Sequence, residues 1–186
     1  ANVRIPSMYN GLYVTYIASS AFLDCKDLVS IIIPNSVTNI GDCAFGGCTS
    51  LTNVYYNGTI EDWCNISFSS SSSNPMCYAS HFYMLNENNE YKEVTEIVIP
   101  ETVTKIGDYK FYGFGNITNI TIPNSVISIG KSAFGGCTSL TSMTLPFIGN
   151  GGSETHFGYI FGATYKSVNY GYVPTTLKEV TITGYK

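Results

Sequence analysis

The chain has 186 residues, of which 44% are hydrophobic and only 12% are charged, so it carries enough apolar side chains to bury a core and is not of the disordered class. Its formal net charge is -4 and Arg4 is its single arginine, which argues against a nucleic-acid partner, because such a surface needs clustered Lys and Arg. No apolar run approaches the roughly 20 residues of a membrane-spanning helix, so we expect no membrane insertion in this segment.

A repeated segment organises the chain. Three stretches superpose without a gap: LVSIIIPNSVTNIGDCAFGGCTS from Leu28, VTEIVIPETVTKIGDYKFYGFGN from Val94 and ITNITIPNSVISIGKSAFGGCTS from Ile117. The step from Pro100 to Pro123 gives the period, which is 23, and two longer segments interrupt it. We predict a single repeat domain over 1–186 with coils near 1–27, 28–50, 51–93, 94–116, 117–139 and 140–176, and a final strand in 177–186.

Each repeat is predicted to begin with a strand that a proline ends, followed by a turn at Pro-Asn-Ser and a short turn segment through Ala-Phe. Gly41, Gly107 and Gly130 are expected to form a second corner with a positive φ angle. Because one repeat cannot bury enough surface to fold alone, the coils must stack on one another. In the second repeat the inward side chains are expected to be Leu28, Ile31, Ile33, Val37, Ile40, Phe45 and Cys48.

Two segments exceed the period and are interpreted as insertions. The first, from 57 to 93, holds five acidic residues and one lysine, and therefore carries the whole net charge of -4. Its serine run at 69–73 is interpreted as a flexible loop, and 78–85 with 91–93 as a β-hairpin. The second, within the long repeat 140–176, is rich in aromatic residues.

The sequence offers no pattern typical of catalysis. Its two histidines, His81 and His156, lie outside the repeated frame, and no nucleophile or phosphate-loop motif accompanies them. Cys64, Cys77 and His81 lack a fourth ligand for a structural zinc site. We therefore expect no enzyme activity, no metal and no cofactor, and a disulfide between Cys64 and Cys77 stays open.

The repeats resemble the BspA-like leucine-rich repeats, because Ile-Pro, Ile-Gly, Ala-Phe and Gly-Cys-x-x-Leu recur at the spacing of that family. The resemblance spans nearly the whole chain. It implies a right-handed leucine-rich-repeat β-solenoid with a parallel sheet on one face, and a role in adhesion or protein binding by a cell-surface or secreted protein. Since the chain opens inside one repeat and ends on the first strand of another, we expect it to be a fragment of a longer array.

Outward positions of the predicted strands are the first candidate binding surface, because side chains alternate between the two faces of a strand. The residues assigned to this concave face are Ile32, Tyr55, Glu96, Val98, Asn119 and Thr121. An alternative set lies in the aromatic segment and comprises Tyr159, Tyr165, Tyr170 and Tyr172. These rings either cover an open edge of the core or stack on a ligand.

The predicted function is a noncatalytic protein-interaction or adhesion module, located at the cell surface or outside the cell. Its partner is expected to be a protein of the extracellular matrix or of a host or neighbouring cell. Two alternatives remain open: a carbohydrate-binding module that uses the exposed aromatic residues, and a passive structural spacer.

Overall fold

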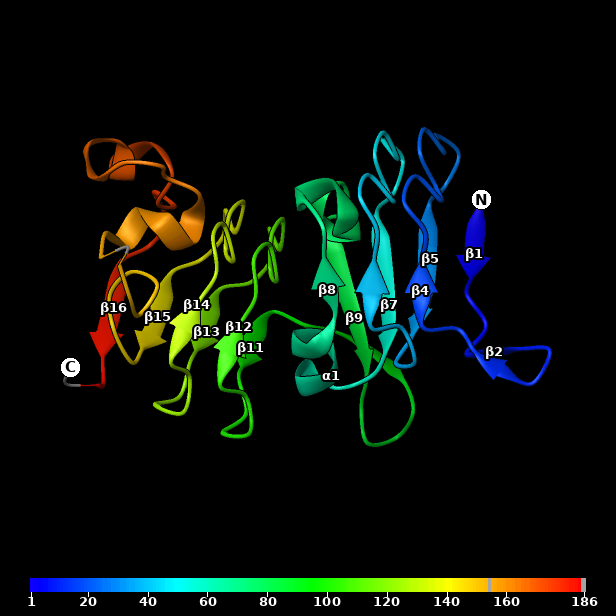
Figure 1. Ribbon diagram of the computed structural model, residues 1–186, viewed down its shortest axis with the longest axis horizontal. Helices are drawn as coiled ribbons and strands as arrows, with labels where there is room; N and C mark the ends of the chain where they lie inside the picture. Colours follow the sequence, from blue (N-terminus) through cyan, green and yellow to red (C-terminus); the bar gives the residue numbers. More distant parts are fainter. Residues whose placement is uncertain (154, 185–186) are drawn as a thin grey trace. The chain divides into compact units, whose positions relative to one another are not determined.

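The fold consists of two compact units, Ala1–Val94 and Thr95–Lys186. The computed structural model describes residues 1–153 and 155–184, except for the side chains at 169 and 170. Each unit has a parallel sheet formed by the first strand of each repeat, and a narrower parallel sheet formed farther along the repeat (Figure 1).

Unit 1 holds a five-stranded sheet in the order β1-β5-β7-β9-β10 and a three-stranded sheet in the order β4-β6-β8. A two-stranded hairpin, β2-β3, completes its strands. The bounds are β1 (Asn2–Arg4), β2 (Met8–Tyr9), β3 (Leu12–Tyr13), β4 (Tyr16–Ile17), β5 (Ser30–Pro34), β6 (Asn39–Ile40), β7 (Asn53–Asn57), α1 (Ile60–Asn65), β8 (Ser67–Phe68), η1 (Ser71–Ser73), η2 (Pro75–Cys77), β9 (His81–Leu85) and β10 (Tyr91–Glu93).

Unit 2 holds a four-stranded sheet in the order β11-β13-β15-β16 and a two-stranded sheet, β12-β14. The bounds are β11 (Glu96–Val98), β12 (Lys105–Ile106), β13 (Asn119–Thr121), β14 (Ser128–Ile129), β15 (Ser142–Leu145), η3 (Phe157–Phe161), η4 (Lys166–Gly171) and β16 (Glu179–Ile182). The repeat fold with mostly parallel strands is confirmed, and antiparallel pairing occurs in the hairpins β2-β3 and β9-β10.

The register of the large sheet in unit 1 shows where its repeats begin. Ser30 pairs with Asn53, which lies one period later, and Asn53 pairs with His81, which lies farther along the chain than one period. Strand β9 is therefore the next rung of the parallel sheet. The segment 57–93, interpreted as one insertion, contains the return path of the coil that begins at β7 and then this rung and its hairpin partner.

The predicted core is confirmed. All seven inward side chains named for the second repeat are at most 3% exposed. Rings at the Ala-Phe position stack from coil to coil, Phe22 on Phe45 with centroids 5.3 Å apart and Phe111 on Phe134 at 5.7 Å. Burying side chains of this size contributes about 1.5 to 3 kcal/mol each, so the inner rows stabilise both units.

The prediction for the second corner is wrong, because Gly41, Gly107 and Gly130 do not have positive φ angles. The residue two positions later takes that conformation, as at Cys43 with φ 51° and Ser132 with φ 54°. Crowding explains the glycine at two of these corners, Gly41 and Gly130, whereas a Cβ atom on Gly107 would meet no atom closer than 3.6 Å. A Cβ atom on Gly41 would lie 2.5 Å from the backbone nitrogen of Ser19, and one on Gly130 would lie 2.4 Å from the backbone nitrogen of Asp108, so the preceding coil leaves no room for a side chain.

Hydroxyl side chains of several threonines join successive coils by hydrogen bonds. Thr38 donates to the carbonyl of Thr15, and Thr118 donates to the carbonyl of Thr95, with an interval of 23 residues in each case. Thr141 in turn donates to the carbonyl of Thr118 at 3.0 Å. The polar residues that make the composition unusual therefore hydrogen-bond along the stack.

The serine run at 69–73 is not the flexible loop that the sequence suggests. Ser73 is fully buried, its hydroxyl accepts from the backbone N–H of Ser70, and the Ser70 hydroxyl donates to Asp42 at 2.6 Å. The carbonyl of Ser72 accepts from the N–H of Phe45. One coil earlier, the carbonyl of Ala44 accepts from the N–H of Phe22 in the same way. The run is ordered because it continues the ladder between coils. The hairpin predicted nearby is confirmed as β9-β10.

None of the described helices is long and apolar enough to span a lipid bilayer.

Candidate functional site

The outward face of the large sheet in unit 1 brings a row of large side chains together. In β5 the side chains of Ile31 and Ile33 are buried, so Ile32 points to the other face. The parallel register then aligns Arg4, Ile32, Tyr55 and Tyr83 on neighbouring strands. The sequence prediction that Ile32 and Tyr55 lie side by side is thus consistent with the observed pairing.

Tyrosines dominate this row. The rings of Tyr55 and Tyr83 stack with centroids 4.8 Å apart and planes 19° from parallel. This distance equals the usual spacing between adjacent strands, about 4.8 Å, because an in-register parallel pair places identical positions directly opposite each other. Both rings are half-buried, and each holds the other in place.

A third tyrosine comes from the hairpin strand β10. The ring of Tyr91 packs edge-on against Tyr55, with centroids 4.8 Å apart and an interplanar angle of 63°. Its hydroxyl donates to Oδ1 of Asn57 at the end of β7. We refer to Ile32, Tyr55, Tyr83 and Tyr91 as the aromatic face.

An ion-pairing contact borders the aromatic face. Nδ1 of His81 lies 2.7 Å from Oε1 of Glu93, and the two side chains are 41% and 33% exposed. Desolvation raises the pKa of the nearby Tyr83 hydroxyl above its usual value, and the charge of Glu93 adds to this effect.

The remaining residues predicted for the concave face lie in unit 2. Glu96 pairs with Asn119 and Val98 with Thr121 on β11 and β13. Nδ2 of Asn119 donates to Oε1 of Glu96 at 3.2 Å. Val98 is 64% exposed, so this face carries one open aliphatic side chain among polar ones. The predicted set falls into these two separate groups, one in each unit.

The alternative tyrosines occupy a segment that mostly packs against the coils. Ile160 and Ala163 are fully buried, and the N–H of Phe134 donates to the carbonyl of Ile160 at 2.8 Å. Tyr159 lies in η3 and is half-buried, whereas Tyr165 and Tyr172 are 70% and 47% exposed. The side chain of Tyr170 lies outside the described residues.

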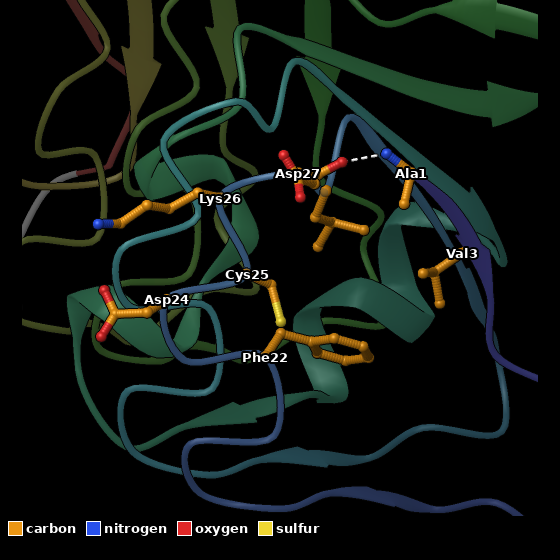
Figure 2. Close-up of a pocket in the computed structure, with 8 residues that line it drawn as sticks. Ala1, Val3, Phe22, Asp24, Cys25, Lys26 and Asp27 are labelled. Carbon is orange, nitrogen blue, oxygen red and sulfur yellow. Dashed lines mark hydrogen bonds between the residues drawn. The ribbon is translucent and has the colours of Figure 1, made fainter.

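A hollow of about 320 Å³ lies on the first coil of unit 1, beside the first side chains of the core (Figure 2). Phe22 and Val3 form apolar walls, and the side chains of Asp24 and Lys26 point away from them in Figure 2. The amino group of Ala1 closes one side by donating to the carbonyl of Asp27. Because Phe22 stacks on Phe45 behind it, this hollow is the open side of the stacked core rather than a site with converging reactive groups.

Cysteine side chains follow the packing of the coils. All six lie in the described part of the chain, and no disulfide joins any two of them, including Cys64 and Cys77. Burial raises the pKa of the Cys137 thiol to about 12 and also raises the pKa of Cys48. Among the described residues, no three His, Cys, Asp or Glu side chains gather in a way that could hold a metal ion.

Tyr83, Tyr91, His81 and Glu93 were missed as site residues by the sequence interpretation. The alternation in His81–Leu85, with Phe82 between two outward positions, is the signal that could have identified β9 as a rung of the sheet. It was hidden because the coil before it is longer than the common period.

The family model described as "BspA type Leucine rich repeat region (6 copies)" matches residues 2–89 and 86–180. The chain belongs to this family. Leucine-rich repeat proteins are generally protein-interaction modules. No curated protein matches it.

Solved structures of bacterial leucine-rich repeat proteins match nearly the whole chain. A T. pallidum leucine-rich repeat protein is 23% identical with a TM-score of 0.45, and the match covers 97% of this chain and 68% of that one. A Bacteroides ovatus leucine-rich repeat protein is 24% identical with a TM-score of 0.47, and the match covers 98% of this chain but only 42% of that one. A leucine-rich cell surface protein from Faecalibacterium prausnitzii is 15% identical with a TM-score of 0.32, over 100% and 88% of the two chains.

Proposed function

We propose that this BspA-type repeat region is a noncatalytic adhesion module that binds a host or neighbouring-cell protein through the aromatic face of unit 1. The observation that carries the proposal is the in-register stack of Tyr55 on Tyr83, with Tyr91 packed against Tyr55. Tyrosine is enriched among the residues that dominate protein interfaces. Core packing does not require the rings of Tyr55 and Tyr83, because they lie on the face opposite to the buried side chains of the same strands.

The aromatic face is preorganised for binding. Each ring is already held by its neighbour, and the hydroxyl of Tyr91 is fixed by its bond to Asn57. Ordering a mobile side chain at an interface costs about 0.5 to 1.5 kcal/mol, so rings that are fixed beforehand lose less free energy when a partner binds.

Charged groups border the aromatic face on opposite sides. Arg4 precedes Ile32 in the row, and Glu93 with His81 follows Tyr83. An apolar centre with a polar rim is the usual anatomy of a protein interface. The same rim would orient a partner that carries complementary charges.

A second contact region is proposed in unit 2, at Glu96, Val98, Asn119 and Thr121. Its support is weaker, since Val98 is the one large apolar side chain among the four. We assign it a contribution to orientation through polar contacts rather than most of the binding free energy.

Carbohydrate binding is the less favoured candidate. A sugar ring stacks on an open aromatic face, whereas Tyr55 and Tyr83 cover each other's faces at 4.8 Å and present edges and hydroxyl groups. Tyr165 and Tyr172 are the exposed tyrosines that support this alternative.

A cell-surface or extracellular location accompanies this proposal. Its support is membership of the BspA-type family, whose repeats imply adhesion by a surface or secreted protein. The partner would then be a matrix protein or a protein on an opposing cell.

The test is a binding screen of the whole chain against a panel of purified extracellular-matrix and host surface proteins, beside a glycan array. For a protein that binds, Tyr55→Ala and Tyr83→Ala are each expected to raise the dissociation constant at least about tenfold. Thr144→Ala, at the corresponding strand position in unit 2 and outside the second contact region, is the matched control and should change it little. Binding to glycans without any protein would overturn the proposal, and binding to neither would favour a spacer.

A further inference from the structure

A second hollow in unit 1 lies at the end of the same outward row. Its volume is about 300 Å³, and it is lined at the carboxyl ends of three adjacent strands by Arg4, Pro34 and Asn57. Residues that follow β1, among them Ile5, Pro6 and Met8, complete its wall. We refer to this hollow as the Arg4 pocket.

Charge distinguishes the Arg4 pocket from the rest of the surface. Residues 1 to 23 contain Arg4 and no Asp or Glu. Among the described residues, no carboxylate forms an ion pair with Arg4. An arginine guanidinium presents parallel N–H donors whose geometry matches a carboxylate. The ligand group that complements this pocket is therefore an anionic, planar acceptor.

Asn57 supplies a second donor at the pocket. Its Oδ1 accepts from the hydroxyl of Tyr91, and its Nδ2 amide carries two hydrogens that are able to donate. Asn57 thereby links the pocket to the aromatic face, because the ring of Tyr91 packs on Tyr55.

The other side of the pocket is apolar and continues into an exposed hairpin. Met8 begins β2 and is 46% exposed, and Tyr9, Leu12 and Tyr13 on the same hairpin are each at least 69% exposed. Asn10 and Gly11 close the hairpin with φ angles of 49° and 79°, which are the values that a tight two-residue turn requires. A ligand that reaches Arg4 therefore meets the apolar side chains of Ile5, Pro6 and Met8 in the same pocket.

We propose that the Arg4 pocket binds the side-chain carboxylate of an aspartate or glutamate that has an apolar neighbour, in a segment of the protein partner. The inference rests on the proposed function and names the chemistry of the partner. Charge complementarity favours an acidic group, since the row offers one cation here with no acid beside it. The row from Arg4 through Ile32 to Tyr55 favours an extended segment that continues past the pocket, so the carboxylate belongs to a side chain rather than to a chain terminus.

The single arginine gives the proposal a direct test. In ¹⁵N spectra of the whole chain, the Nε–Hε signal of Arg4 is the only one of its kind. Titration with the capped peptide acetyl-Leu-Asp-N-methylamide is expected to shift this signal in a saturable way. The Asn counterpart, equal in size but uncharged, should bind at least about tenfold more weakly.

Two further probes separate other sources of the same carboxylate. Acetyl-leucine carries a chain-terminal carboxylate, and glucuronic acid carries one on a sugar ring. Both are expected to bind more weakly than the Asp peptide. Tighter binding of either probe would overturn the assignment to a protein side chain, and equal shifts with the Asn peptide would overturn the role of charge.

Variants identify the group responsible, with the Met8 methyl signal as the readout. Arg4→Gln should abolish the response to the Asp peptide, and Arg4→Lys should weaken it severalfold, because an ammonium group lacks the planar pair of donors. Lys92→Gln, which removes an exposed cation on β10, is the control and should leave the response unchanged. An unchanged response in Arg4→Gln would overturn the proposal.

The two proposals fail in distinguishable ways. If Tyr55→Ala abolishes binding of a matrix protein while the Asp peptide leaves Arg4 unshifted, the pocket assignment is wrong and the aromatic face stands. If the peptide shifts the Nε–Hε signal of Arg4 but no protein in the panel binds, the assignment of the aromatic face as a protein-binding surface is wrong.

Discussion

The two units share their inner rows and differ on their outward faces. In unit 1 the row that contains Ile32 also presents Arg4, Tyr55 and Tyr83, whereas the matching row in unit 2 presents Val98 and then the threonines at 121, 144 and 181. The inner side chains of both are apolar and mostly buried, although Val180 and Ile182 on the last strand, β16, are exposed. Since alternation on a strand separates the two faces, the core can be kept constant while the outer surface is varied.

The difference indicates that folding and binding make separate demands on the same strands. Threonine satisfies a strand that only has to remain soluble and ordered, because its branched side chain favours the pleated conformation. The three tyrosines of the aromatic face contribute nothing to the inner rows, which is why we propose this face as the contact surface for a partner. If this view is correct, the inner rows of the two units should be equally important for stability, and the units should differ in their outward residues.

The largest effect is expected from the stacked phenylalanines of the inner rows. Phe45→Ala in unit 1 and Phe134→Ala in unit 2 should each lower the free energy of unfolding by about 3 to 5 kcal/mol, because both rings are fully buried. Urea titrations of the two variants and of the parent measure this. A midpoint that does not move for one of them would show that the inner rows are not equivalent.

Cysteines at the same repeat position should differ strongly in reactivity. Cys25 is exposed, whereas Cys137 is buried and its pKa is raised to about 12 by desolvation. Alkylation followed by mass spectrometry is expected to modify Cys137 at least about tenfold more slowly than Cys25, since the thiolate is the reactive form. Equal rates would mean that the coil around Cys137 opens readily.

The raised pKa of Cys137 also predicts how stability depends on pH. The ordinary thiol pKa is 9.0, so the unfolded chain loses this proton as the pH rises above 9, while the folded chain holds it up to about 12. The contribution of the buried thiol is therefore complete below pH 9 and declines between pH 9 and 12. Comparison with Cys137→Ala isolates it, because the variant lacks this part of the decline. Identical pH profiles for the two proteins would contradict the assignment.

The helix α1 occurs in the coil of unit 1 that follows β7, and its start depends on a capping box. The hydroxyl of Thr59 accepts from the N–H of Asp62 at 3.1 Å, and Oδ2 of Asp62 accepts from the N–H of Thr59 at 2.9 Å. Thr59→Ala should lower the free energy of unfolding by about 1 kcal/mol. Thr59→Ser keeps the hydroxyl and should lose far less; equal losses in both variants would show that the cap is not responsible.

The smallest effect on stability is expected at Tyr56, which lies on the inner face of β7, next to the outward Tyr55. Its ring is fully buried against Trp63, and its hydroxyl has no hydrogen-bond partner among the described residues. Tyr56→Phe removes a polar group that burial penalises, so the free energy of unfolding should stay the same or rise by up to about 1 kcal/mol. A loss of stability would mean that the hydroxyl is hydrogen-bonded in solution. Tyr55→Phe, on the outward face, serves as the comparison and should be neutral.

Most of the fold could be predicted from the sequence, because the fold repeats. The inward positions of the second repeat and the hairpin after Leu85 follow from spacing and alternation, and the parallel pairing is what the family resemblance implies. The corner glycines and the serine run could not be predicted correctly. Their conformations are decided by a neighbouring coil, which crowds Gly41 and accepts the hydrogen bond at Ser72.

For the candidate site, the sequence identified two members of the aromatic face, Ile32 and Tyr55, and the tertiary structure added Tyr83 and Tyr91. The sequence determines the period, the family and the alternation of inner and outer residues, because these are local patterns. It does not determine which residue stands beside Tyr55, since the coil that separates it from Tyr83 is longer than the common period. That pairing is set by hydrogen bonds between strands far apart in the chain, and those bonds exist only after the coils have stacked.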